Sequence, residues 1–532
     1  MKTINYIRQV SISELKKRKK SVFTLIMIHF TTMILSVLLP LLNGNFLDLL
    51  ISDIAVVELL RYALIIIVIG IISSLFAYIY NVLSIRLKNR IAFEINLNVI
   101  NHMHKIGLRK FEEYNISYLN QRVNADATTI SDFFFDNFLV IAMNVIQFFV
   151  LIYILVRIKI IFFLIILLFI PIYIFLYAWL KKPLYSNGSK YKEEQNIFFD
   201  KLNEQFELNK EIKIHSDIET QEIDVRKQYE YFVHSLIKLT KISSLFNSLD
   251  GIICLVFQAI SLLVGGLMVI ENWITLGEYS ILSLYFTNIL GIIKYFFSFG
   301  KTYQDFKISV NRMNDLLLIQ EECDGKNNIN NFNSITVTYN NKKYKFEKGK
   351  LNIICGKNGI GKTTLLYILT GILQNPESQV CFEDTPSSVI NMYEIRKKNV
   401  SFMVQNEKTG NVKVKDYLYR SLEINSKEEL EKIIDEKNLR YVFCNARFNL
   451  YDYLGKSLGG ISDGERQIII LFKTLAKECN ALLLDEPSSN LSLSFTAQII
   501  DYLKSIMDKK IVVIVSHENA FIENADYVIE VI

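Results

Sequence analysis

The sequence lacks paired cysteines. Its six cysteines are scattered, and no two of them form a CxxC pair. One lies inside an apolar run, and five fall in the more polar second half: Cys254, then Cys323, Cys355, Cys381, Cys444 and Cys479. This spacing predicts reduced thiols in a cytosolic environment.

A strong excess of charge of one sign is also missing. The chain has 59 Lys and Arg residues against 54 Asp and Glu residues, and the basic residues cluster beside apolar runs. Nucleic-acid binding usually needs a basic stripe, so we exclude nucleic acid as the main partner. A cleavable signal peptide is not predicted either, because the first apolar run is too long for one.

Long apolar runs are abundant. The chain is 51% hydrophobic with a mean hydropathy of +0.25, which is high for a wholly soluble protein. Six runs approach the length of about 20 residues that crosses a bilayer. They occupy residues 22–42, 63–83, 138–156, 160–180, 252–270 and 279–299. Runs such as residues 160–180 are apolar on every face, which predicts a six-helix, all-α transmembrane domain.

The basic residues between these runs predict their orientation. Residues 1–20, 84–137 and 181–251 hold seven, seven and eleven Lys or Arg residues, whereas 43–62 holds one and 271–278 none. Only Arg157 and Lys159 oppose this trend. Because Lys and Arg favour the cytoplasmic side, we expect a multi-pass protein of the cytoplasmic membrane, with the N-terminus and second half in the cytoplasm. The two long connections predict helical arms reaching about 40 Å below the membrane.

Ionisable groups in or near the spans suggest function, because they are costly in a bilayer. Lys294 lies in the sixth run, and Asp136 and Asp250 lie near the cytoplasmic ends of others. Lys294 either lines an inner cavity or extends its side chain toward the cytoplasm.

A glycine-rich loop begins the second half. Residues 351–366 read LNIICGKNGIGKTTLL, in which a β-branched run precedes a GxxxxGK[ST] loop that opens a helix. This is the context of a P-loop, whose backbone amides converge on phosphates. Lys362 would add a charge and Thr363 a hydroxyl for Mg²⁺. The predicted nucleotide-binding residues are Gly356, Lys357, Asn358, Gly359, Ile360, Gly361, Lys362, Thr363 and Thr364.

Two further apolar runs end in candidate catalytic residues. ALLLDEP, residues 481–487, ends in two carboxylates. Such a strand would deliver Asp485 to the metal and Glu486 to a water, which Glu486 would activate as general base. IVVIVSH ends at His517, a candidate γ-phosphate sensor. A lone histidine after a strand is more often structural, but its position relative to Glu486 favours the functional interpretation.

The motifs GKNGIGKTT, MVQNE, ISDGERQ, LLLDEPSSNLS and VSHE occur in an order that resembles the nucleotide-binding domain of ATP-binding cassette (ABC) transporters. The six spans resemble the exporter-type membrane domain, and residues 111–134 resemble its first intracellular loop, with Arg122 and Asp126 at the expected places. The resemblance implies a half-transporter. We expect a multi-domain membrane protein with a transmembrane domain at 1–318 and an α/β P-loop ATPase domain at 319–532.

The resemblance also implies roles for single residues. Tyr339 would stack on adenine, although Tyr344 competes with it. Gln405 would contact Mg²⁺ and sense the membrane domain. The D-loop would comprise Ser489, Asn490 and Leu491, with Ser492 where the family usually has aspartate.

The stretch SLGGISDGERQ offers two candidates for the signature loop. In the family, the serine of LSGGQ precedes the aspartate of the second strand by about 23 residues. Ser462 is 23 residues before Asp485, and Ser457 is 28 before it. The predicted signature is therefore Ser462, Asp463, Gly464 and Glu465. Asp463 is unusual there: its carboxylate either faces the γ-phosphate, with a repulsion of about 3 kcal/mol, or points away and caps the helix.

The resemblance implies ATP and Mg²⁺ as cofactors and a dimer, because the signature acts on ATP held by another subunit. We expect ATP-driven export by alternating access, with a peptide as favoured cargo ahead of lipids or drugs. A homodimer and a heterodimer with another half-transporter remain open, as does a weakly active or regulatory role. About 20 residues precede the first span, so we expect no leader-processing domain there, and the chain ends without the terminal helical segment of most relatives.

Overall fold

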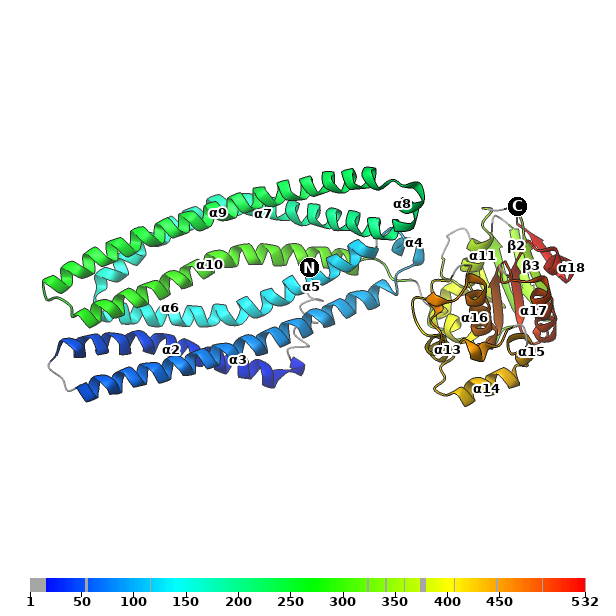
Figure 1. Ribbon diagram of the computed structural model, residues 1–532, viewed down its shortest axis with the longest axis horizontal. Coiled ribbons are helices and arrows are strands. Elements are labelled where there is room, and N and C mark those ends of the chain that lie inside the picture. The colour runs from blue at the N-terminus through cyan, green and yellow to red at the C-terminus, as the bar shows by residue number, and fades with distance from the viewer. Residues whose placement is uncertain are drawn as a thin grey trace. The chain divides into compact units, whose positions relative to one another are not determined.

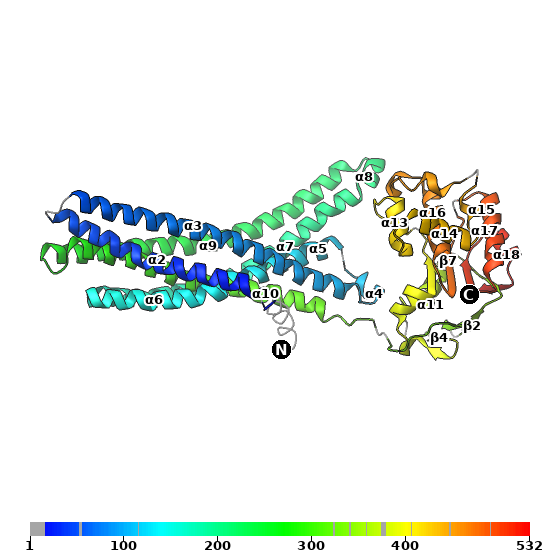
Figure 2. The ribbon, with the colours of Figure 1, turned by 90° about the horizontal axis from the view of Figure 1, so that it is seen from below.

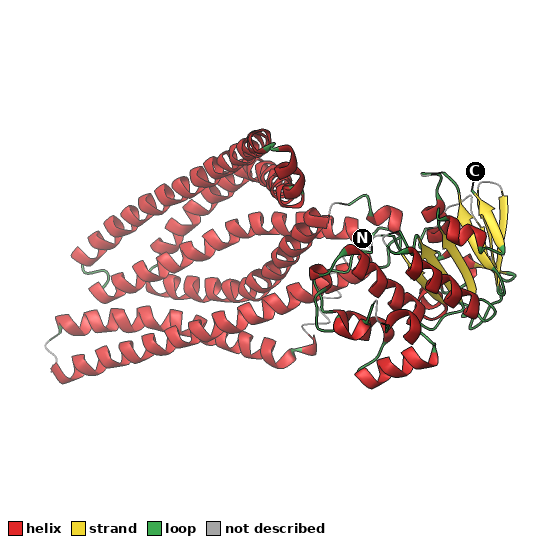
Figure 3. Cartoon of the chain, turned by 45° about the vertical axis from the view of Figure 1, so that its right-hand side comes forward, coloured by secondary structure: helices red, strands yellow, loops and turns green. Residues whose placement is uncertain are grey.

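The computed structural model describes residues 16–52, 56–114, 116–322, 325–339, 342–357, 359–373, 379–405, 407–445, 448–489 and 491–531. The chain divides into two compact units. The first contains the described residues up to Ile106 and Glu112–Gln320, and the second contains Gly107–Phe111 and the described residues from Glu321. Figure 3 shows that the first unit is helical and that the strands belong to the second.

The first unit is built from long helices, and six helical stretches in the described residues are long and apolar enough to cross a membrane. The predicted six-helix, all-α membrane domain is therefore confirmed. In chain order, the helices are α2 (Lys19–Ile51), α3 (Val56–Met103), α5 (Ile116–Phe133) with the π-helical turn η1 (Phe134–Phe138) and α6 (Leu139–Ile158), α7 (Ile160–Glu207), α9 (Ile218–Ile270) and α10 (Leu276–Leu317).

Four of these helices extend well beyond their apolar runs. α3 and α7 each have 48 residues, α9 has 53 and α10 has 42. At 1.5 Å per residue, α9 is about 80 Å long, more than twice the roughly 30 Å hydrocarbon core. The polar continuation of each helix forms an arm, as the long connections predict. Figure 2 shows α7 and α9 running as a pair to the short helix α8 (Asn209–His215).

Buried polar contacts tie α5 to the end of α10. The carboxylate of Asp126 is almost fully buried and accepts a hydrogen bond from Ser309 Oγ at 2.9 Å. It also pairs with Arg312 Nε at 3.1 Å. Arg122 donates to the carbonyl of Arg312 at 2.7 Å. Both residues that the sequence singled out in this segment therefore join α5 to α10.

The second unit contains two sheets. The strands are β1 (Ser334–Tyr339), β2 (Lys342–Glu347), β3 (Leu351–Cys355), β4 (Gln379–Phe382), β5 (Thr385–Pro386), β6 (Val400–Met403), β7 (Ala481–Asp485), β8 (Ile511–Val515) and β9 (Tyr527–Glu530). An antiparallel sheet has the order β2-β1-β4-β5, and a parallel sheet has the order β6-β7-β8-β3-β9. This α/β arrangement confirms the predicted class of the second half.

Helices pack around the parallel sheet. They are α11 (Lys362–Leu369), α13 (Val414–Leu422), α14 (Lys427–Glu436), α15 (Arg440–Phe443), α16 (Asp463–Ala476), α17 (Leu493–Ile506) and α18 (Asn519–Glu523) (Figure 1). Every residue of β7 and β8 is buried, which explains why these strands read as unbroken apolar runs. Because the strands are parallel, their carboxyl ends share one edge of the sheet, and ligands bind at that edge in such folds.

Candidate functional site

The glycine loop joins β3 to α11. Gly356, Gly359 and Gly361 have φ angles of 144°, 82° and 100°, which residues with a side chain rarely adopt. The loop curls so that Lys362 Nζ donates to the carbonyls of Gly356 and Lys357, at 2.8 and 2.9 Å. Lys362 is only 7% exposed. The ammonium group is thus held inside the loop, where a phosphate could replace the two carbonyls. Asn358 lies outside the described residues.

The first helical turn after this loop meets the end of β7. Thr363 Oγ1 donates to Asp485 Oδ2 at 2.9 Å. Burial raises the pKa of Asp485, while the hydrogen bond from Thr363 opposes the shift. A buried carboxylate beside a hydroxyl provides the hard oxygen donors that Mg²⁺ prefers. The described residues contain no cluster of three His, Cys, Asp or Glu side chains that could cage a metal. The donor set therefore fits a magnesium ion that is also bound by substrate phosphates.

The next residue, Glu486, is held in an unusual backbone conformation. Its φ angle is +48°, a left-handed value that is uncommon for glutamate. Its amide donates to the carbonyl of Val515 at 2.9 Å, and its carboxylate accepts from Gln405 Nε2 at 2.7 Å. The two adjacent carboxylates thus have different partners: Asp485 accepts a hydrogen bond from Thr363, and Glu486 accepts one from Gln405.

His517 lies two residues after the end of β8, the strand beside β7. The bond from Glu486 to Val515 brings the two strand ends together. The imidazole is exposed. The structure therefore places His517 at the same edge of the sheet as Glu486, with its ring open to solvent.

Tyr339 and Tyr344 are both buried, each 8% exposed. The Tyr339 hydroxyl lies against Gly361, so that a side chain at Gly361 would collide with it. Tyr344 pairs across the sheet with Val337. Tyr339 is therefore the tyrosine beside the glycine loop.

Ser462 is the N-cap of α16. Its hydroxyl accepts from the amide of Glu465 at 3.3 Å, and the Glu465 carboxylate accepts from the Ser462 amide at 2.9 Å, which completes a capping box. The Tyr453 hydroxyl donates to Glu465 at 2.7 Å. This bond lowers the pKa of Glu465 and raises the pKa of Tyr453 to about 12. Because Ser462 is the cap, the interpretation of Asp463 as the helix cap is wrong.

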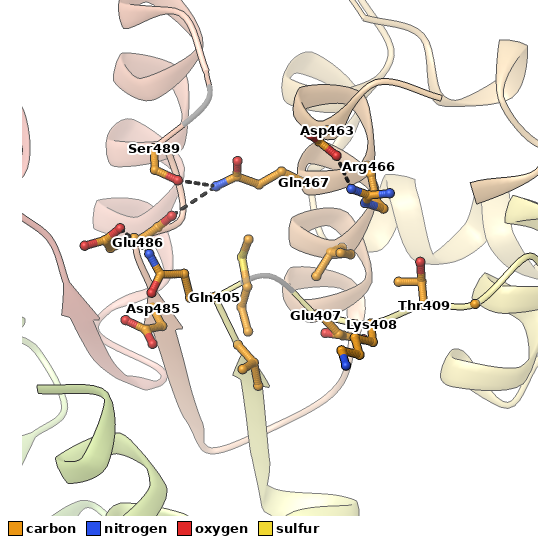
Figure 4. Close-up of a pocket in the computed structure, with 14 residues that line it drawn as sticks. Gln405, Glu407, Lys408, Thr409, Asp463, Arg466, Gln467, Asp485, Glu486 and Ser489 are labelled. Carbon is orange, nitrogen blue, oxygen red and sulfur yellow. Dashed lines mark hydrogen bonds and ion pairs between the residues drawn. The ribbon is translucent and has the colours of Figure 1, made fainter. Parts of the chain in front are cut away.

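Asp463 is the first residue of α16, directly followed by Gly464. Its carboxylate forms an ion pair with Arg466, one turn along the same helix. The Asp463 side chain is 78% exposed. Figure 4 shows the carboxylate turned toward the Arg466 guanidinium. The negative charge that the sequence places in this loop is thus accompanied by a positive one.

A pocket of about 490 Å³ lies between the end of β7, the segment after β6 and α16 (Figure 4), and none of the described residues of the glycine loop lines it. Gln405, Asp485 and Glu486 line one part of it, and Asp463 and Arg466 line the part on α16. The other lining residues are Met403, Val404, Glu407, Lys408, Thr409, Gly410, Gln467, Ile470 and Ser489. Of the four predicted signature residues, only Asp463 lines this pocket.

Gln467 was missed by the sequence reasoning. Its amide donates to the carbonyl of Glu486 at 3.0 Å and to Ser489 Oγ at 3.3 Å, as Figure 4 shows. It links α16 to the loop that contains Ser489 and Leu491, the predicted D-loop residues, while Asn490 lies outside the described residues. Gln467 ends the motif ISDGERQ and lies in the first turns of α16, so its position beside the predicted signature was the signal in the sequence.

The membrane unit contains a second candidate site. Lys294 lines a pocket of about 250 Å³ between α9 and α10. Its ammonium lies 2.6 Å from the carboxylate of Asp250, which is buried. Lys294 and Asp250, which the sequence singled out separately, are thus partners, while Asp136 pairs with Lys88 at 2.6 Å.

Both halves of the chain match known families. Residues 22–293 match the ABC transporter transmembrane region, and residues 339–489 match the ABC transporter domain. The first match alone covers slightly more than half of the 532 residues.

Individual relatives differ in how much they cover. The chain is 22% identical to the ABC transporter ATP-binding protein YfiC of Bacillus subtilis, over 97% of this chain and 88% of that protein. It is 31% identical to the nisin transport ATP-binding protein NisT of Lactococcus lactis, but the match covers 35% of this chain and 32% of NisT. A bacterial Atm1-family ABC exporter with ATP bound shares the fold, with a TM-score of 0.82, 15% identity, and 97% and 94% of the two chains covered.

Proposed function

This chain belongs to the ABC transporters, whose membrane region and ATP-hydrolysing domain it joins in one polypeptide, and from this premise we propose that it exports a cargo from the cytoplasm as an ATP-driven dimer. One observation supports the proposal. Thr363 contacts Asp485, and Gln405 contacts the adjacent Glu486, so that four residues to which we assign roles in ATP hydrolysis lie together at one edge of the sheet.

Each group has a proposed task. The backbone of Gly356–Thr364 and the Lys362 ammonium bind the ATP phosphates, and Tyr339 flanks the loop on the adenine side. Thr363, Asp485 and Gln405 would hold Mg²⁺, which neutralises phosphate charge when it is bound. Glu486 accepts a proton from the attacking water, and His517 contacts the γ-phosphate.

The second half of each ATP site comes from another subunit. Of the four signature residues, only Asp463 lines the pocket that contains Asp485 and Glu486. We propose that Ser462, Asp463, Gly464 and Glu465 contact ATP bound by the partner, with Ser489, Asn490 and Leu491 beside them. ATP binding joins the two nucleotide domains, and hydrolysis separates them. The long helical arms convey this change to the spans.

The membrane orientation follows the basic residues, with both the N-terminus and the nucleotide domain in the cytoplasm. For the boundary, we propose a membrane domain of residues 1–318 and a nucleotide domain of residues 319–532. For the cargo, we propose a peptide. The resemblance to exporters supports it, and one relative is named for nisin transport.

We propose a homodimer, because the ion pair with Arg466 offsets the negative charge of the Asp463 carboxylate, the unusual residue of the signature. The purified chain alone, in liposomes, should therefore hydrolyse ATP in a saturable manner. Turnover that requires a second, different half-transporter would contradict the homodimer.

Variants of the ion pair test this electrostatic account. Arg466→Ala leaves the Asp463 carboxylate uncompensated near the γ-phosphate of the partner's ATP, so we expect the KM for ATP to rise about tenfold. Asp463→Gly in the same chain removes that charge and should restore the KM to within about twofold. Steady-state phosphate release measures both. If Asp463→Gly alone accelerates turnover more than about tenfold, Asp463 weakens the site despite Arg466, and the heterodimer is favoured.

A further inference from the structure

The pocket between α9 and α10 lies within the predicted membrane spans. Its volume is about 250 Å³, and it is lined by Cys254, Gln258, Ser261, Ser283, Phe286, Thr287, Leu290, Gly291 and Lys294. α9 and α10 lie side by side and are joined by a short connection at one end (Figure 1). The lining combines apolar side chains with the polar side chains of Gln258, Ser261, Ser283, Thr287 and Lys294.

Several of these polar side chains lack a protein partner. In the described part of the chain, the side chains of Gln258, Ser261 and Ser283 make no hydrogen bond to another residue. Ser261 is only 4% exposed, whereas Gln258 is exposed. The hydrogen-bonding groups of these three side chains are therefore available to a polar group of a ligand in this pocket.

The ion pair at one end of the pocket sets the sign of that group. The Asp250 carboxylate is 3% exposed, does not line the pocket, and accepts a hydrogen bond from Tyr173 at 3.1 Å. The Lys294 side chain is 54% exposed and does line it. The negatively charged Asp250 of this pair is therefore buried, and the positively charged Lys294 faces the pocket. Among the described residues, no Asp or Glu lines the pocket.

A larger cavity lies between α7 and α10. Its volume is about 630 Å³, and its lining is Lys181, Tyr185, Phe296, Phe299, Gly300, Tyr303, Gln304 and Lys307. Its residues on α10 lie on the face of the helix opposite the residues that line the smaller pocket, because an α-helix turns about 100° per residue. The larger cavity is therefore separate from the pocket that Lys294 lines.

We propose that the smaller pocket binds the C-terminal carboxylate of a peptide cargo, with Lys294 as its ion-pair partner and Gln258 and Ser261 as hydrogen-bonding partners. Lys294 already shares its charge with Asp250, so a carboxylate, with one negative charge, matches it better than a doubly charged phosphate. A volume of 250 Å³ accommodates one terminal residue rather than a folded chain. The assignment rests on the proposed export function and names the cargo class for it.

Binding of matched peptides to the nucleotide-free protein tests this proposal. The probes are N-dansyl-trileucine and its C-terminal amide, and the protein is the full chain in nanodiscs of phosphatidylcholine. Fluorescence anisotropy should show that the acid binds at least about tenfold tighter than the amide, the effect of one charge-assisted hydrogen bond. The preference should vanish in the double variant Lys294→Gln, Asp250→Asn, which avoids leaving a buried carboxylate unpaired.

Two controls separate binding from folding. Lys294→Arg keeps the ion pair and should keep the preference for the acid. Lys241→Gln removes an exposed lysine of α9 outside both cavities and should leave both affinities unchanged.

Four results would overturn the proposal: equal binding of acid and amide, binding of neither, a preference that survives in the double variant, or displacement of the acid by equimolar phosphatidylglycerol. The last result would assign the site to a lipid. This binding assay needs no ATP, so it is independent of the proposed ATPase activity. If the protein hydrolyses ATP but binds acid and amide equally, the carboxylate site is contradicted and the proposed export function is not.

Discussion

Glu486→Gln should lower the rate of ATP hydrolysis at least about 100-fold and leave ATP binding nearly unchanged. In the proposed mechanism the carboxylate accepts the proton of the attacking water, which an amide of the same shape would not accept, so the expected loss matches the contribution of a general base. The substitution preserves volume, and Gln405 has a hydrogen-bond acceptor at this position in either case. The protein should therefore remain folded, with ATP trapped between two subunits.

Phosphate release and retention of radiolabelled ATP measure the two halves of this prediction. Glu478→Gln is a matched control, because Glu478 is exposed, follows the C-terminal end of α16 and does not line the pocket. A turnover number for Glu486→Gln within about threefold of the unmodified chain would show that another group activates the water.

Lys362→Met should weaken ATP binding at least about 100-fold. The Lys362 ammonium is held inside the glycine loop by two carbonyls, and we propose that the ATP phosphates bind in this loop. Hydrogen bonds from an ammonium to an anion contribute about 1.5–3 kcal/mol each, and methionine supplies none of them while keeping similar bulk.

Isothermal titration with MgATP measures the loss. Lys509→Met, at an exposed position between α17 and β8, removes the same charge elsewhere in the second unit and should not change affinity. An ATP affinity of Lys362→Met within about threefold of the unmodified chain would mean that the loop does not bind the phosphates through this lysine.

The architecture could be predicted from the sequence because each half has a strong local signal. Apolar runs of membrane length identify the spans, and the GxxxxGK[ST] loop after a β-branched run identifies β3 and α11. The ends of the helices were less predictable. The polar arm of α7 continues without a break from residues 160–180 to Glu207, so the apolar run marks only the part of the helix that the bilayer surrounds.

The side-chain partners could not be predicted, because they depend on tertiary packing. Asp250 and Lys294 are 44 residues apart on antiparallel helices, and nothing local to either residue indicates the other. Arg466 lies three residues from Asp463, but only the capping of α16 by Ser462 leaves the Asp463 carboxylate free to reach it. The left-handed backbone at Glu486 follows from the turn after β7 rather than from the preference of glutamate.

We propose that ATP binding changes the side of the membrane to which the pocket between α9 and α10 opens, from the cytoplasm to the outside. Ser283 lines that pocket on the part of α10 nearest its connection to α9, the predicted outer side. The most direct test places Ser283→Cys in a chain with Cys254→Ala and Glu486→Gln, and adds a membrane-impermeant maleimide outside right-side-out liposomes. With ATP inside, we predict that labelling of the introduced thiol increases at least about tenfold. Labelling that is equal with and without ATP would contradict alternating access.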